Sequence, residues 1–336
     1  MKNSISKEPQ IDQSELFQVD KTSFEAFAKK VFLRQYRTNK VYKKYCELLN
    51  FNPTQATTLR QIPFLPISAF KNHRIASSTF KDAIVFYSSG TTANNKSVHH
   101  LKDLSVYENS FTKTFESNYG KISDYALLAL LPSYMEQKSS SLIYMVNSLM
   151  QKSKQKENGF FLNEHEKLKN RLEHLIKAKK KTILIGVSFA LLDFMEKYQI
   201  KAGDETLIVM ETGGMKGRRK EISRMELHRQ LKSGFGVKQI HSEYGMTELL
   251  SQAYAKDNGR FYPPPWMRVL IRKADDPFTY CKIGETGGIN IIDLANLHSV
   301  SFIQTDDLGK LHQDGSFEVL GRFDQAEIRG CNLMNN

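Results

Sequence analysis

The segment Tyr87–Ser97 reads Tyr-Ser-Ser-Gly-Thr-Thr-Ala-Asn-Asn-Lys-Ser and follows the short apolar run Ile84–Phe86. The apolar run predicts a buried strand, so the hydroxyls, the glycine and Lys96 emerge from a strand end into a turn. Such a turn can offer backbone N–H groups, hydroxyl donors and a cation to a phosphate. A Ser/Thr/Asn-rich surface loop is the alternative interpretation when the segment is taken alone.

The same segment is close to a P-loop. The pattern Gly-x-x-x-x-Gly-Lys-Ser/Thr would run from Gly90 to Ser97, but Asn95 stands where the second glycine belongs. Asparagine can adopt the left-handed backbone conformation, so this departure weakens the P-loop interpretation without excluding it. The motifs downstream have to decide between two kinds of nucleotide site.

Composition limits the class of protein. The chain has 336 residues, of which 40% are hydrophobic and 25% charged, as in soluble globular proteins. It has no apolar run of membrane-spanning length and no signal peptide at Met1–Ser4, so we expect a cytoplasmic protein. The net charge of +12 suits anionic ligands, but no nucleic-acid-binding motif is present. Three scattered cysteines are too few for a disulfide framework or a zinc site.

The order of expected elements predicts an α/β architecture with a largely parallel sheet. Polar residues 1–20 are expected to be mobile, and residues 1–80 form a helical and extended lead-in. Residues 81–286 form an α/β core, and residues 287–336 a β-rich subdomain without helices. The expected helices are 23–49, 101–117, 139–150, one capped by Asn163, and 189–198; the expected strands are 125–131, 182–187, 207–210, 237–240, 289–292, 301–304 and 317–320.

Four further motifs are predicted to follow strands. Glu211–Met215 contains paired glycines, which let a ligand approach the backbone closely. Ser242–Glu248 reads Ser-Glu-Tyr-Gly-Met-Thr-Glu and offers a ring for base stacking, a hydroxyl and a carboxylate suited to Mg²⁺. Thr305–Asp307 offers hydrogen bonds to ribose hydroxyls, and Gly321–Asp324 offers Arg322 to a phosphate or ribose. Each motif alone could be an ordinary turn.

Taken in order, the five motifs resemble the adenylate-forming superfamily of acyl-CoA synthetases, luciferases and adenylation domains. A P-loop enzyme would need none of the last four, so the P-loop interpretation is set aside. Glu211–Arg219, Glu243–Gln252 and Gly321–Leu333 resemble, more narrowly, the acyl-protein synthetase (LuxE) family, which is related to phenylacetate–CoA ligase. So do Leu131–Tyr134 and Asp293–Asn296. The resemblance implies the large domain of the adenylate-forming fold, with parallel-rich sheets, flanking helices and a β-rich C-terminal subdomain.

The resemblance also implies a mechanism. A carboxylate attacks the α-phosphorus of ATP, pyrophosphate leaves, and a thiol then attacks the acyl-adenylate. Residues implied to cradle the β- and γ-phosphates are Ser88, Ser89, Gly90, Thr91, Thr92 and Lys96. Gly213, Gly214 and Tyr244 would flank adenine and the acyl carboxylate, Thr247 would contact the α-phosphate, Glu248 would hold Mg²⁺, and Asp306 would bind ribose beside Arg322.

Two departures from the superfamily pattern bear on activity. Ala93 replaces a usual glycine, and Asn95 replaces the proline that usually precedes the lysine. The small C-terminal lid domain with its catalytic lysine is expected to be absent.

Near the end of the chain, Cys331 is implied by the resemblance to accept the acyl group as a thioester. Arg329 could favour its nucleophilic thiolate form. The alternative for Cys331 is a small apolar residue that closes a strand. Cys46 and Cys281 are interpreted as structural.

The leading hypothesis is an ATP- and Mg²⁺-dependent acyl-protein synthetase of the acid–thiol ligase type. It would activate a carboxylic acid, expected to be fatty, and pass the acyl group through Cys331 to an acyl-CoA-reductase-like or acyl-carrier partner protein. One alternative is an acyl- or aryl-CoA ligase core that uses CoA. A second is a non-catalytic nucleotide- or acyl-binding protein, favoured by Ala93 and by the missing lysine domain.

Overall fold

The structure is a computed structural model, and it describes residues 11–89, 96–203, 206–215, 218–220 and 222–323. The chain forms two compact units, each considered by itself. The first unit comprises the described residues of Met1–Ser110, Thr247–Ser251 and Pro263–Asn336; the second comprises those of Phe111–Met246 and Gln252–Tyr262. None of the helices in the described part of the chain combines the length and apolar character needed to cross a membrane.

The second unit is built on the predicted parallel sheet. Its strand order is β5-β4-β6-β7-β8-β9, and only β9 runs antiparallel to its neighbour. Every residue of β4 and β6 is buried, as expected for central strands covered on both faces. The strands are β4 (Ala126–Leu130), β5 (Gly159–Phe160), β6 (Thr182–Val187), β7 (Leu207–Thr212), β8 (Ile240–Tyr244) and β9 (Ala253–Ala255). The short strand β10 (Arg260–Phe261) follows β9 in the chain and is not part of this sheet.

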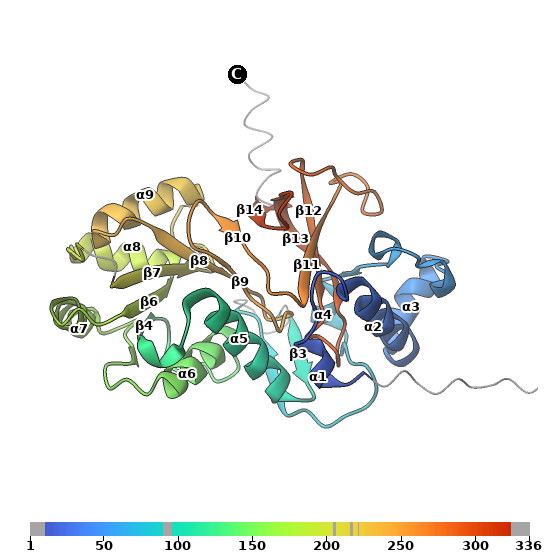
Figure 1. The fold of residues 1–336 in the computed structure, drawn as a ribbon, viewed down its shortest axis with the longest axis horizontal. Coiled ribbons are helices and arrows are strands. Elements are labelled where there is room, and N and C mark those ends of the chain that lie inside the picture. The colour runs from blue at the N-terminus through green and yellow to red at the C-terminus, as the bar shows by residue number, and fades with distance from the viewer. Residues whose placement is uncertain (1–10, 90–95, 204–205, 216–217, 221, 324–336) are drawn as a thin grey trace, which may run out of the picture. The chain divides into compact units, whose positions relative to one another are not determined.

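Helices cover both faces of this sheet, with α8 and α9 on one face and α6 on the other (Figure 1). The helices are α5 (Leu104–Tyr119), which begins in the first unit, η4 (Ile122–Asp124), α6 (Ser141–Ser153), α7 (His165–Lys177), α8 (Ser188–Lys197) and α9 (Arg224–Phe235). The side chain of Ser223 caps α9, and Gly236 ends it with a positive φ of 62°. The predicted cap of α7 at Asn163 was wrong, because Glu164 is the N-cap residue and makes no side-chain cap bond.

The first unit contains an antiparallel sheet in the order β14-β13-β12-β11, with β1 parallel to β13. Its strands are β1 (Leu65–Pro66), β11 (Met267–Arg272), β12 (Thr286–Asp293), β13 (Phe302–Leu311) and β14 (Phe317–Arg322). The hairpin of β2 (Ile84–Tyr87) and β3 (Val98–Leu101) forms a separate two-stranded sheet. The helices are α1 (Gln13–Leu16), α2 (Phe24–Thr38), α3 (Lys40–Leu48), η1 (Pro53–Gln55), η2 (Leu59–Gln61) and α4 (Ala69–Asn72).

Aromatic packing joins the N-terminal helices of the first unit to its sheet, beside which α2 and α3 lie in Figure 1. Phe32 of α2 meets Phe302 of β13 edge-on at 6.0 Å, and Tyr42 of α3 stacks on Phe302 at 6.4 Å. Such pairs add to the free energy gained from burying the rings. The first unit therefore draws its core from both ends of the sequence.

Several predicted elements need correction in the first unit. The lead-in helix predicted over 23–49 is two helices, because Asn39 leaves the helical conformation and caps α3 by accepting from the N–H of Tyr42. The described residues of the segment predicted to be mobile include Leu16 and Val19, which are buried. The strand over 84–86 is only half-buried, since Phe86 alone of its residues is fully covered.

The strands that carry the motifs also differ from prediction. β7 and β13 extend beyond their predicted ends at 210 and 304, and β8 begins where the strand predicted over 237–240 was expected to stop. Glu211, Glu243 and Asp306 therefore lie inside strands rather than in the turns after them. Likewise, Gly321 and Arg322 belong to β14.

Candidate functional site

The β2–β3 hairpin holds the two ends of the candidate phosphate loop together. The N–H of Ser88 donates to the carbonyl of Ser97 at 3.0 Å, and the N–H of Ser97 donates to Ser88 Oγ at 2.9 Å. Ser89 is exposed, and Lys96 is half-buried at the other end. The loop residues Gly90, Thr91, Thr92, Ala93 and Asn95 lie outside the described part of the chain.

Glu248 lies next to Ser97, where the candidate phosphate loop ends and β3 begins. Its side chain is buried, with the residue 6% exposed, and the Ser97 side chain hydrogen-bonds to its carboxyl group. Burial raises the pKa of Glu248, and the nearby carboxylate of Asp307 raises it further, whereas Ser97 and Lys71 act in the opposite direction. The loop end and the acidic motif residue are thus in direct contact within the first unit.

The segment Thr247–Ser251 is fixed by the last residue of β12 and by the turn that follows it. Asp293 is fully buried, and its carboxylate accepts from the N–H groups of Leu250 and Ser251 at 2.8 and 2.9 Å and from Ser251 Oγ at 2.6 Å. Asn296 Nδ2 donates to the carbonyl of Glu248 at 2.8 Å. The position of Glu248 is therefore set by its backbone and not only by its side chain.

Asp306 and Arg322, both predicted to lie at a ribose site, do come together. Arg322 Nη2 lies 3.4 Å from Asp306 Oδ2, and each side chain is 53% exposed. The two residues stand on neighbouring strands, where Asp307 and Arg322 are Cα partners.

A buried arginine that the sequence did not single out, Arg272, links strands β12 and β13 close to Asp306. Arg272 donates to the carbonyls of Ile289 and Thr305 at 2.9 and 2.7 Å and to Asn290 Oδ1 at 3.0 Å. A Cβ on Gly288 would lie 2.4 Å from the Arg272 Cζ, so the guanidinium needs a glycine there. Burial lowers the pKa of Arg272, and the negative field of Asp306 opposes that effect.

In the second unit, the paired glycines follow β7 directly. Gly213 and Gly214 have φ values of 71° and 65°, a conformation that favours glycine. The residue before them, Thr212, donates from Oγ1 to Glu243 Oε2 at 2.6 Å. Glu243 is 7% exposed, and burial raises its pKa to about 7. A Cβ on Gly245 would lie 2.5 Å from Glu243 Oε1, so the carboxyl group packs tightly against that turn.

A second buried carboxylate, Glu211, lies beside this pair. Ser188 Oγ donates to its Oε2 at 3.2 Å, while Arg224 Nε and His228 Nε2 lie 3.5 and 3.6 Å from its Oε1. Burial alone would raise the pKa of Glu211, but His228 and Arg224 outweigh burial and lower it. The pKa of Glu211 is therefore lowered and that of Glu243 raised, although the two residues lie near the ends of neighbouring strands.

Tyr244, predicted to flank adenine, ends β8. It is buried, and its ring packs on that of Phe261 at 5.7 Å. The Arg224 guanidinium lies over the ring of Phe261, 4.9 Å from its centroid. Tyr244 and Arg224 thus both pack against Phe261.

The described cysteines are poor candidates for a nucleophile. Cys46 is buried, which raises its pKa to about 12, and burial also raises the pKa of the half-buried Cys281. A thiolate is the reactive form, so both residues favour the inert thiol. Cys331 and Arg329 lie outside the described residues. Within the described ranges, no group of three His, Cys, Asp or Glu side chains is placed to hold a metal ion by itself.

Comparison with known families agrees with these motifs. A family model described as "Acyl-protein synthetase, LuxE" matches residues 11–336. A long-chain-fatty-acid–luciferin-component ligase from Aliivibrio fischeri is 24% identical over 346 aligned positions, which cover 94% of this chain and 89% of that protein.

Solved structures show the same fold. A 2-hydroxyisobutyryl-CoA ligase in an open conformation, in complex with 2-HIB-AMP and CoA, has a TM-score of 0.67 at 12% identity over 96% of this chain and 78% of its own. ATP-bound MatB from Rhodopseudomonas palustris has a TM-score of 0.53 at 17% identity over 73% of this chain. The chain spans 50% of the length of MatB. The predicted adenylate-forming fold is confirmed.

Proposed function

Because the chain belongs to the acyl-protein synthetase (LuxE) family and is thereby a ligase, we propose that it uses ATP to activate a carboxylic acid as an acyl-adenylate. The observation that best supports this function is the contact between Ser97 at the end of the candidate phosphate loop and the buried carboxyl group of Glu248. This contact supports the proposal because it joins the end of the proposed phosphate loop to the proposed magnesium ligand within one unit.

Glu248 fits a magnesium ion. Its carboxyl group is buried next to the like charge of Asp307, so its ionised form is disfavoured until a cation offsets both effects. Magnesium in nucleotide enzymes is usually held by one or two carboxylates together with phosphate oxygens, so no dense cluster of protein ligands is needed. When bound, Mg²⁺ would neutralise charge on the phosphates.

The remaining roles follow the motifs. Lys96 and the loop residues Ser88, Ser89, Gly90, Thr91 and Thr92 grip the β- and γ-phosphates through backbone N–H groups, hydroxyls and one ammonium group. Thr247 contacts the α-phosphate. Gly213, Gly214 and Tyr244 flank adenine and the acyl carboxylate, while Asp306 accepts hydrogen bonds from the ribose hydroxyls beside Arg322.

In the first step, an oxygen of the substrate carboxylate bonds to the α-phosphorus as the bond to the β-phosphate oxygen breaks, and pyrophosphate leaves. In the second step, a thiolate attacks the acyl carbonyl and AMP leaves. We assign the thiolate to Cys331, which would then pass the acyl group to an acyl-CoA-reductase-like or acyl-carrier partner protein. The name of the A. fischeri relative supports a long-chain acid, as does the buried, nearly uncharged helix α6.

Two measurements test these steps separately. Acid-dependent exchange of labelled pyrophosphate into ATP reports adenylate formation. Protein labelling by a radioactive long-chain fatty acid with ATP and Mg²⁺ reports the thioester, which hydroxylamine cleaves. We expect Cys331→Ser to retain exchange and lose the label, and Cys281→Ser, the matched control at a half-buried thiol, to retain both.

Each other outcome identifies an alternative. Labelling of Cys331→Ser at the wild-type level would exclude Cys331 as the residue that accepts the acyl group. Release of AMP that requires CoA, without protein labelling, would favour an acyl-CoA ligase. Absence of exchange with every acid tried would favour a non-catalytic binding protein.

A further inference from the structure

We propose that His99 is a positioning residue of the adenylating site, which holds the Thr247 carbonyl and so fixes the Thr247–Glu248 pair against strand β3. This role rests on the proposed function. No motif in the sequence singles out His99, and its assignment comes from its contacts.

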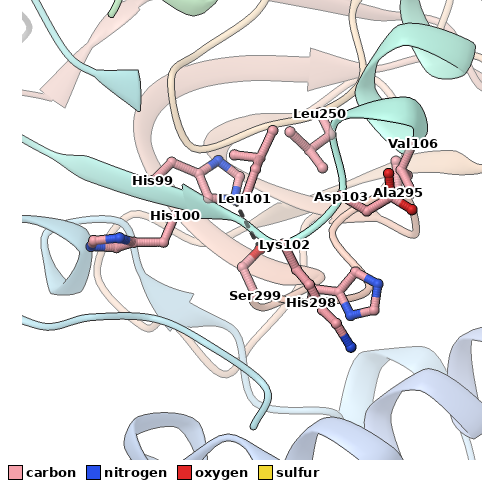
Figure 2. A pocket seen from close by; sticks show the side chains of 10 residues that line it. All are labelled: His99, His100, Leu101, Lys102, Asp103, Val106, Leu250, Ala295, His298 and Ser299. Atoms are coloured by element: carbon pink, nitrogen blue, oxygen red, sulfur yellow. Dashed lines mark hydrogen bonds between the residues drawn. The ribbon is translucent and has the colours of Figure 1, made fainter. Parts of the chain in front are cut away.

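Both nitrogens of the His99 ring are used. Nδ1 lies 2.8 Å from the carbonyl oxygen of Thr247, and Nε2 lies 3.0 Å from Ser299 Oγ. Figure 2 shows the second contact as a dashed line, at the edge of a small pocket also lined by Leu250 and His298. The residue is 1% exposed, and its ring meets that of Phe70 edge-on at 5.5 Å.

These partners fix the direction of each hydrogen bond. A backbone carbonyl only accepts, so Nδ1 must carry the proton. Burial lowers the pKa of His99 to about 4, so the ring is neutral and Nε2 keeps its lone pair. Ser299 Oγ therefore donates to Nε2, and Nδ1 donates to Thr247. The Thr247 carbonyl therefore sets the tautomer of His99, because the hydrogen bond made by one ring nitrogen determines which nitrogen carries the proton.

Burial alternates along β3, and His99 is one of its buried residues. Ser97, which immediately precedes that strand, is buried as well. Ser97 contacts the carboxyl group of Glu248, and His99 holds the carbonyl one residue earlier. His99 and the residue just before β3 thus contact both members of the Thr247–Glu248 pair.

The next residue supplies a matched control. His100 lies on the opposite face of β3, where its Nδ1 is 2.9 Å from Asp82 Oδ2 and 2.7 Å from Arg74 Nη1. In Figure 2 its side chain points away from His99. A substitution of His100 changes the same strand without touching Thr247 or Ser299.

The experiment compares three variants by acid-dependent pyrophosphate exchange. His99→Phe keeps a ring against Phe70 and removes both hydrogen bonds, and we expect kcat to fall about 100-fold with the KM for the acid unchanged. His99→Asn keeps an amide donor at the place of Nδ1, so it should recover most of that loss. His100→Phe should exchange at the wild-type rate.

The tautomer is checked independently by ¹⁵N NMR of the imidazole nitrogens in the ligand-free protein, where a proton on Nδ1 and none on Nε2 is expected for His99. A proton on Nε2 instead would overturn the proposal, even if His99→Phe failed to fold. Equal exchange by wild type and His99→Phe would overturn the role of His99 alone. No exchange by the wild-type protein would overturn the proposed function and this role with it.

Discussion

Thr212 and Glu243 are register partners at the ends of β7 and β8, and a hydrogen bond of 2.6 Å from Thr212 Oγ1 to Glu243 Oε2 joins their side chains. Gly213 follows Thr212 and Tyr244 follows Glu243, so one side-chain bond joins the residue before the paired glycines to the residue before the predicted adenine-flanking tyrosine. The carboxyl group that accepts the bond is buried and sits near a second carboxylate, Glu211. We therefore expect the free energy of unfolding to depend on the protonation of Glu243.

Glu243→Gln should change the pH dependence of unfolding. Burial raises the pKa of Glu243 from 4.5 to about 7, so the folded state binds this proton more tightly than the unfolded chain. The stabilisation is complete below pH 4.5 and is lost as the pH rises through 7. The free energy of unfolding of wild type should therefore fall relative to the glutamine variant across this interval, by about 3 kcal/mol at most.

Urea unfolding at a series of pH values measures this difference. Glu116→Gln, at an exposed position of α5, is the control and should follow the wild-type curve. Parallel curves for wild type and Glu243→Gln would show that Glu243 does not titrate in this range.

Glu248→Gln should separate stability from activity. The carboxyl group is buried and its pKa is raised by that burial, so its charged form costs free energy in the ligand-free protein. The amide removes this cost, and the melting temperature should stay level or rise. Pyrophosphate exchange should nevertheless fall about 100-fold, because no carboxylate remains to hold Mg²⁺.

Melting temperature and exchange rate at several Mg²⁺ concentrations test this expectation. Glu166→Gln, on the exposed face of α7, should change neither quantity. A glutamine variant with the wild-type rate and Mg²⁺ dependence would exclude Glu248 as the metal ligand.

Asp306→Asn should impair ATP binding and leave stability intact. Its ion pair with Arg322 is half-exposed, and such pairs contribute at most about 1 kcal/mol to stability. A carboxylate that accepts from ribose hydroxyls contributes more to binding, so the KM for ATP should rise about tenfold. Asp193→Asn breaks another exposed ion pair, with Arg219, and should leave KM unchanged. An unchanged KM in Asp306→Asn would contradict the ribose role.

Strands that are buried on both faces were the easiest to predict. The strand predicted over 182–187 coincides with β6 because its residues form a continuous apolar run. β8 reads Ile-His-Ser-Glu-Tyr, and its polar residues Ser242 and Glu243 are buried because neighbouring elements supply hydrogen bonds. β11 was not predicted, since it contains the buried Arg272. A local pattern cannot reveal partners that lie on other elements.

The same limit applies to the site. The motifs identified Glu248, Asp306 and Arg322, and the last two are in contact. The sequence did not single out His99, and it marked Asp293 only as part of a family motif without its contacts, because their partners Thr247 and Ser251 lie 148 and 42 residues away along the chain. The one feature that could have pointed to His99 is its place at a buried position of the alternating strand β3, just after the candidate phosphate loop.

The division of the chain into two units has a consequence for synthesis on the ribosome. The second unit is complete once Tyr262 has emerged, whereas the first requires three separate segments. Phe32 and Tyr42, made early, find their aromatic partner Phe302 only when β13 appears. Until then α2 and α3 carry an uncovered apolar face, which is the kind of surface that aggregates or recruits chaperones. Phe32 and Tyr42 are therefore translated well before they can reach their native contacts.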